Sequence, residues 1–146
     1  MQPVDRVRRS GVPPERSGEF NRFADAWMLE ELRQVVRREL RTHRGQQSLA
    51  RMAGVGRSVV RKLVEMRSVP VTANLDRLRE WAADRPLAEA PLEAVCLALL
   101  VEELPANARY RARLELAEAL TRLHREAGSE VPGWLVRELE DRRRHP

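Results

Sequence analysis

The sequence predicts an all-α fold. Apolar residues recur at three- and four-residue steps through most of the chain, which is the spacing of one face of a helix. Hydrophobic residues make up 42% of the 146 residues but aromatic residues only 4%, so the core must be built mainly from Leu, Val and Ala. No pair of segments has the alternation of paired strands. A chain of this length fits one compact domain or two small helical parts that share a core.

The first residues of the chain, 1–18, predict a flexible basic tail. They include prolines, glycines and scattered arginines without an apolar period. The arginines are candidates for phosphate contacts, although a tail without a role is the simpler explanation. From Glu19 to His43 the apolar residues follow the helical period, and Gly45 can end the helix. This segment allows one long helix or two helices broken near Trp27.

Three short helices are expected next, at Gln46–Gly54, Arg57–Met66 and Thr72–Asp84. Thr72 is a suitable N-cap for the third of them. Together with the preceding long segment, these helices predict a four- or five-helix domain over residues 19–85.

The rest of the chain, 86–146, is predicted to be a helical C-terminal extension. Its helices are expected at Pro91–Leu104, Ala108–Ala127 and Pro132–Arg144. The first of these is apolar on almost all sides, so other groups must cover it. Either a second copy of the chain covers it, which makes the protein a homodimer, or neighbouring helices of the same chain do so.

The charge is uneven along the chain. Basic residues outnumber acidic residues by 13 to 7 in residues 30–85, whereas the counts are 5 to 4 in residues 1–29 and 9 to 11 in residues 86–146. A central basic segment is typical of a protein that binds a polyanion, because neutralised phosphates release their counterions. The alternative is a solvated surface in an arginine-rich proteome, since Lys62 is the only lysine.

The most informative segment runs from Gln46 to Leu63. A helix-turn-helix requires a small residue where its two helices approach each other, a turn residue that tolerates positive φ, and apolar residues on the inner faces. Ala50 and Gly54 meet the first two requirements. The third is met by Leu49, Ala53, Val55, Val60 and Leu63.

The second helix of this segment has one apolar face and one narrow polar face. At about 100° per residue its polar side chains fall within an arc of about 140°. They are Arg57, Ser58, Arg61, Lys62 and Glu65. Long cationic side chains on a helix held by its apolar back are what a reader of the DNA major groove requires. The alternative is a solvated face with an ion pair between Arg61 and Glu65.

These residues resemble the phage repressor and Cro-like regulators, the XRE family of helix-turn-helix proteins. The resemblance covers about Leu32 to Ala83 and is carried by Gln46, Leu49-Ala50, Ala53-Gly54-Val55, Arg57-Ser58 and Leu63. It implies a four- or five-helix domain that binds palindromic double-stranded DNA as a dimer.

The resemblance also implies roles for individual residues. Gln46 would touch phosphate, and Arg61 would lie on the flank nearer the DNA backbone. The base-reading positions would be Arg57, Ser58 and Lys62. Gln47 completes the set of candidate DNA-binding residues.

Several residues depart from the family's pattern. Gly56 stands where a Ser or Thr cap is usual, Val64 where a polar residue is common, and Met66 where a glycine often closes the recognition helix. Val59 is apolar where a polar residue is frequent, and it can either contact a thymine methyl group or pack in the core. Because of these departures, the resemblance does not predict at which residues the second helix begins and ends.

We therefore expect a cytoplasmic, sequence-specific transcriptional regulator, with repression as its mode of action. Residues 19–85 would bind DNA, and residues 86–146 would complete the core and form a homodimer. The alternative is a protein-interaction module, such as an antitoxin or an adaptor, that holds a partner through its C-terminal helices.

Catalytic, metal-binding and membrane-spanning functions have no support in the sequence, whereas a ligand-sensing role stays open, although a helical extension of about 60 residues has little room for a pocket. His43, His124 and His145 share no ligand spacing and Cys96 is the only cysteine, so we expect neither a metal site nor an intramolecular disulfide. The sequence contains no phosphate-binding loop and no nucleophile motif, so we expect no catalytic residues and no cofactor. The longest apolar run has eight residues, which is too short to cross a membrane.

Overall fold

The computed structural model describes residues 14–42 and 45–144, and side chains for residues 22–42 and 45–140. Over these ranges the chain forms seven α-helices and no strand. The helices are α2 (Pro14–Thr42), α3 (Gly45–Ala53), α4 (Arg57–Val64), α5 (Thr72–Ala83), α6 (Leu92–Glu102), α7 (Ala106–Glu126) and α8 (Gly133–Arg144). The predicted all-α fold is confirmed.

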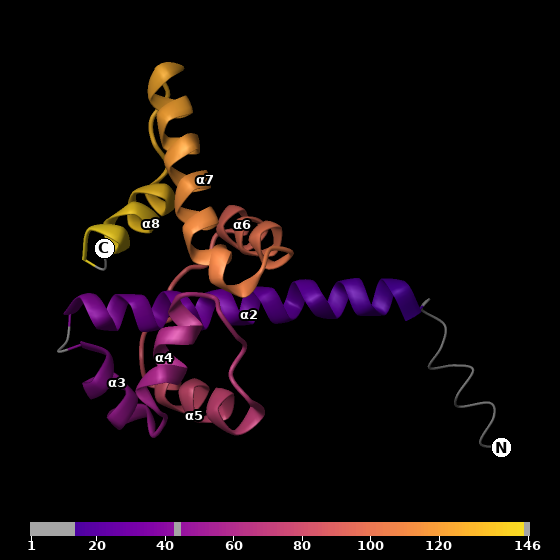
Figure 1. Ribbon diagram of the computed structural model, residues 1–146, viewed down its shortest axis with the longest axis vertical. Helices are drawn as coiled ribbons and strands as arrows, with labels where there is room; N and C mark the ends of the chain where they lie inside the picture. Colours follow the sequence, from indigo (N-terminus) through magenta and orange to yellow (C-terminus); the bar gives the residue numbers. More distant parts are fainter. Residues whose placement is uncertain (1–13, 43–44, 145–146) are drawn as a thin grey trace.

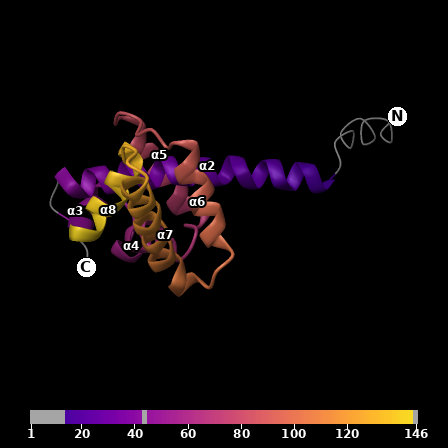
Figure 2. The same cartoon turned by 90° about the horizontal axis from the view of Figure 1, so that it is seen from above.

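The long helix α2 lies between two groups of shorter helices (Figure 1). α3, α4 and α5 pack against one side of α2, while α6, α7 and α8 lie on the other side. The N-terminal part of α2 extends beyond both groups, as the view from above also shows (Figure 2). α2 runs through Trp27 without a break, so the long apolar segment forms one helix and not two.

α2 also begins earlier than predicted. Residues 14–18, expected in the flexible tail, belong to its first turns. Pro14 suits this start, because the first turn of a helix does not use the backbone N–H that proline lacks, and the proline ring already holds a helical φ. The rest of the expected tail, residues 1–13, lies outside the described residues.

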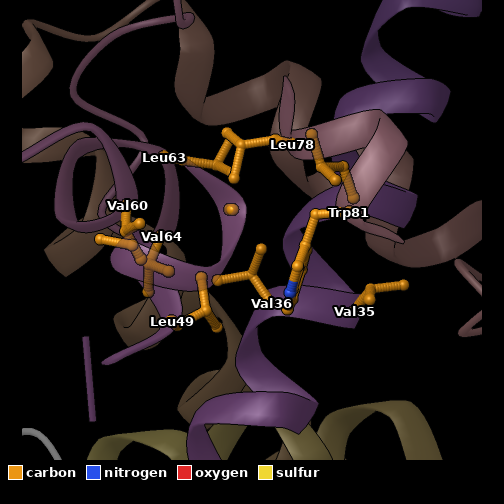
Figure 3. Packing of buried hydrophobic residues seen from close by; sticks show 11 residues of the cluster. Val35, Val36, Leu49, Val60, Leu63, Val64, Leu78 and Trp81 are labelled. Carbon is orange, nitrogen blue, oxygen red and sulfur yellow. The ribbon is translucent and has the colours of Figure 1, made fainter. Parts of the chain in front are cut away.

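Helices α3, α4 and α5 match the predicted segments to within two residues. Their inner faces form an apolar core with α2, in which side chains from all four helices point toward one another (Figure 3). The labelled members of this core are Val35, Val36, Leu49, Val60, Leu63, Val64, Leu78 and Trp81. One detail of the prediction was wrong: Thr72 is the first residue of α5, and Val71 occupies the cap position without a side-chain hydrogen bond.

The apolar helix α6 is covered on one face only. Its buried residues are Ala94, Val95, Leu97, Ala98 and Val101. On the opposite face Leu92 is 52% exposed and Leu100 is 68% exposed, and Cys96 is exposed as well. The alternative in which neighbouring helices of the same chain cover α6 requires these side chains to be buried. The neighbouring helices therefore do not cover α6 completely.

Helices α7 and α8 meet α2 through buried charges. Arg113 of α7 is fully buried between Glu30 of α2 and Glu138 of α8. Its Nη1 donates to Glu30 Oε2 at 2.9 Å and its Nε donates to Glu138 Oε2 at 3.1 Å. Two arginines of α2 extend this cluster: Arg37 donates to Glu138 at 3.3 Å and Arg33 donates to Glu30. We refer to these five residues as the buried ion cluster.

Both carboxylates of the cluster are stabilised in their charged form. Burial alone would raise the pKa of Glu30, but Arg113 and Arg33 outweigh it and hold that pKa well below its usual range. Burial opposes ionisation of Glu138 in the same way, and Arg37 and Arg113 keep the pKa of Glu138 lowered. Despite its burial, Arg113 has a raised pKa because both glutamates favour its cation. The cluster is therefore ionic at neutral pH.

Within the part of the chain that the structure describes, no helix is both long enough and apolar enough to cross a membrane.

Candidate nucleic-acid interface

The turn between α3 and α4 requires a residue with positive φ. α3 ends at Ala53, and Gly54 follows it with a φ of +75°. The turn is closed by hydrogen bonds from Val55 N to Ala50 O at 3.0 Å and from Gly54 N to Arg51 O at 3.3 Å. A Cβ on Gly54 would meet only Arg77 Cδ, at 3.9 Å, so backbone conformation and not space requires the glycine. The sequence-based role of Gly54 is confirmed.

The back of α4 is held in the apolar core. Val60, Leu63 and Val64 are buried against α2 and α3. Val59 is partly buried and packs against the same core, which favours its packing role over a contact with thymine. The packing of this apolar side in the core therefore fixes the orientation of α4.

The opposite side of α4 presents cations to solvent. Arg57, Ser58, Arg61 and Lys62 are all exposed. Glu65 pairs with Arg67, whose Nε lies 2.9 Å from Glu65 Oε2, and not with Arg61. No acidic group among the described residues lies within ion-pair distance of the three α4 cations. The solvated ion pair that competed with the DNA-binding interpretation is thus absent here.

The two glutamines lie in the first turn of α3, after Gly45 with its φ of +86°. Gln47 is exposed and Gln46 is partly buried. Since α3 packs directly against α4, all six candidate residues lie on two adjoining helices. We call these six residues the α3–α4 surface.

The ends of α4 reflect the departures from the family's pattern. Gly56 caps α4 in an extended conformation without a side-chain hydrogen bond. At the other end α4 stops at Val64, two residues before the predicted end at Met66. Met66 adopts a φ of +59°, and Arg67 N donates to Lys62 O at 2.9 Å, which is how a helix ends when its next residue is left-handed.

Burial explains why a methionine holds this left-handed position. The Met66 side chain is 8% exposed and packs against Ala98 and Val101 of α6. Its carbonyl oxygen accepts a hydrogen bond from Arg109 Nη1 at 3.3 Å, and its sulfur lies 3.5 Å from Arg113 Nη1. A glycine would relieve the backbone but would lose these side-chain contacts. Met66 therefore joins the end of α4 to α6 and α7.

Arg33 adds a second connection to α4. Its Nε donates to Leu63 O at 2.9 Å, while its Nη1 reaches Glu30 of the buried ion cluster. Burial lowers the pKa of Arg33 to about 10, against the opposite effect of Glu30. Sequence reasoning missed Arg33, Arg109 and Arg113. The only sequence signal was that these arginines are in helical phase with apolar residues. That signal does not distinguish a buried, paired arginine from one whose aliphatic part lies on the surface and whose charge is in solvent.

Among the residues that the structure describes, no three His, Cys, Asp or Glu side chains are grouped so that they could hold a metal ion. Comparison of the chain with protein-family models, with curated proteins and with solved structures finds no match.

Proposed function

We propose that this chain is a sequence-specific double-stranded DNA-binding protein of the XRE type that inserts α4 into the major groove and represses transcription. The observation that carries the proposal is the exposed side of α4, where three cations have no acidic partner among the described residues. The opposite side of the same helix is buried. In this proposal the protein acts in the cytoplasm and has no catalytic role.

The dimensions of α4 suit this role. An α-helix with its side chains is about 10–12 Å in diameter, and a major groove about 12 Å wide admits it. Arg57 stands at the N-terminal end of α4, where recognition helices commonly contact base edges. A bidentate contact from Arg57 to guanine would contribute about 1–3 kcal/mol of discrimination, and Lys62 would add a second contact. Gln46, Gln47 and Arg61 would hold the surface on the phosphates.

A homodimer through α6 would complete the site. The exposed apolar face of α6, with Leu92, Cys96 and Leu100, is the kind of surface that a second copy covers. A two-fold dimer would present two copies of α4 to half-sites about 34 Å apart, or a multiple of that spacing. We expect light scattering to give twice the chain mass for the wild type and the single chain mass for Leu100→Glu. A monomeric wild type would contradict the dimer.

Fluorescence anisotropy tests the DNA-binding proposal. The full chain is titrated with the DNA upstream of its own gene and with random DNA, from about 50 to about 200 mM salt. The test variant is Arg57→Ala/Lys62→Ala. We expect the wild type to prefer its upstream DNA at the higher salt and the double variant to lose that preference, with an affinity at least about tenfold weaker.

The matched control is Arg122→Ala/Arg125→Ala, which removes the same charge from exposed positions on α7. It should keep the preference for upstream DNA. Equal loss in both double variants, or equal binding to both DNAs that disappears with salt, would mean a non-specific electrostatic surface. A stable complex with the product of an adjacent gene would then favour the protein-interaction module.

A further inference from the structure

A cavity of about 500 Å³ lies where the two groups of helices meet, beside the C-terminal end of α4. It is bordered by α2, by the connection from α4 to α5, and by α5, α6 and α7. Much of its wall is apolar, formed by Leu29, Leu63, Met66, Val69, Leu75 and Ala98. This volume lies in the range of pockets that hold small organic ligands.

The charged groups of the cavity are unequally matched. Arg22 and Glu102 form a half-exposed pair, with 3.6 Å between Nε and Oε2, and Asp25 is exposed. Two further cations, Arg33 and Arg109, lie closer to α4. Apart from the Arg22–Glu102 pair, the cavity wall holds two guanidinium groups and one exposed carboxylate. Arg33 is paired with Glu30 of the buried ion cluster, whereas Arg109 has no carboxylate partner among the described residues.

The partners of Arg33 and Arg109 leave hydrogen-bonding capacity. Arg109 donates from Nε to Leu104 O at 3.0 Å and from Nη1 to Met66 O at 3.3 Å, so its partners are neutral carbonyls. Arg33 donates to Leu63 O and shares Glu30 with Arg113. Neither Nη2 atom donates to a described residue. Arg109 also lies in the first turn of α7, which holds no acidic side chain, so the helix dipole adds to the positive potential.

We propose that this cavity binds a small amphiphilic carboxylate, with its apolar body against the aliphatic wall and its anionic group on Arg109 and Arg33. A carboxylate accepts from guanidinium groups in a planar, two-bond geometry, which neutral carbonyls cannot provide. The apolar body gains by leaving water.

A ligand at this position contacts the end of α4. Arg109 and Arg33 are the side chains that hold the carbonyls of Met66 and Leu63, so an anion that draws their guanidinium groups into the cavity alters these two hydrogen bonds. Met66 keeps its left-handed backbone through these contacts and its packing on α6. Occupation of the cavity therefore changes the position of α4 and its affinity for DNA. This regulatory step rests on the proposed DNA-binding function, whereas ligand binding does not.

Isothermal titration calorimetry of the full chain tests the binding step. The probes are 2-naphthoate and its uncharged analogue 2-naphthamide, which have the same apolar body. We expect the wild type to bind one naphthoate per chain, at least about tenfold more tightly than naphthamide. Arg109→Gln should reduce this difference, because it removes one of the two cations that bind the carboxylate and leaves the apolar wall in place.

A steric variant locates the ligand. Ala26 lines the cavity from α2, so Ala26→Trp should abolish binding of both probes. Ala24→Trp, on an exposed position of the same helix, should bind both as the wild type does. Circular dichroism and thermal unfolding establish that both variants are folded. Equal affinity for acid and amide, no naphthoate binding at millimolar concentration, or unchanged binding by folded Ala26→Trp would overturn the proposal.

The DNA titration with and without saturating naphthoate tests regulation separately. We expect the affinity for upstream DNA to change by at least about threefold in the wild type and not to change in Ala26→Trp. An unchanged DNA affinity with bound naphthoate would overturn the regulatory step and leave the ligand site. If the chain binds no DNA, the proposed function fails, and calorimetry still decides whether the cavity binds the carboxylate.

Discussion

The two sides of α2 are held by different kinds of contact. Toward α3, α4 and α5 it presents Leu32 and Val36, and the contact is an apolar core. Toward α7 and α8 it presents Glu30 and Arg37, and the contact is the buried ion cluster around Arg113. Apolar contacts are non-directional, whereas buried charges require partners at hydrogen-bonding distance and are costly without them. We therefore expect the first side to tolerate changes of shape and the second to depend on individual atoms.

The largest effect is expected from Arg113→Met. This change leaves Glu30 and Glu138 buried without their shared cation, and breaking such a cluster typically costs about 3–5 kcal/mol. Urea unfolding followed by circular dichroism measures the loss. Arg113→Lys should lose most of the same stability, because an ammonium cannot replace the planar contacts to two carboxylates. The control is Arg111→Met on the exposed side of α7, expected within about 0.5 kcal/mol of the wild type.

Acid should reduce the difference between the wild type and Arg113→Met. The pKa values of Glu30 and Glu138 are lowered by folding, so their stabilisation is present above the ordinary glutamate pKa of about 4.3 and is lost as the pH falls through and below it. Arg113→Met lacks most of this stabilisation. We expect urea unfolding at about pH 7, about pH 4 and about pH 2 to show a difference that is largely kept at about pH 4 and shrinks further at about pH 2. A difference that grew as the pH fell would contradict the assignment of two ionised carboxylates.

The smallest effect is expected on the apolar side, from Leu49→Met. Leu49 of α3 is buried in the core with α2 and α4, and exchange for another apolar side chain of similar volume usually costs less than about 1.5 kcal/mol. The same urea titration measures it beside Arg113→Lys, a conservative change on the other side of α2. Equal losses from the two substitutions would remove the contrast between the two sides.

The candidate surface could largely be predicted from the sequence. Arg57, Ser58, Arg61 and Lys62 share one face because a helix places residues three and four apart together, and Gly54 was identifiable because few residues accept a positive φ. Whether Arg61 pairs with Glu65 could not be predicted, since Arg67 competes for that carboxylate from outside the helix. That competition depends on how the chain turns at Met66.

The sequence by itself determined the helical class, the approximate helix positions and the polar face of α4, because each depends on residues close together in the chain. Only the tertiary structure decided that α6 keeps an exposed face and that Arg113 joins carboxylates 83 and 25 residues away. It also decided that a cavity lies beside α4. The physical reason is that an arginine in helical phase is equally suited to solvent and to a buried pair, and that its partners are known only once distant helices meet.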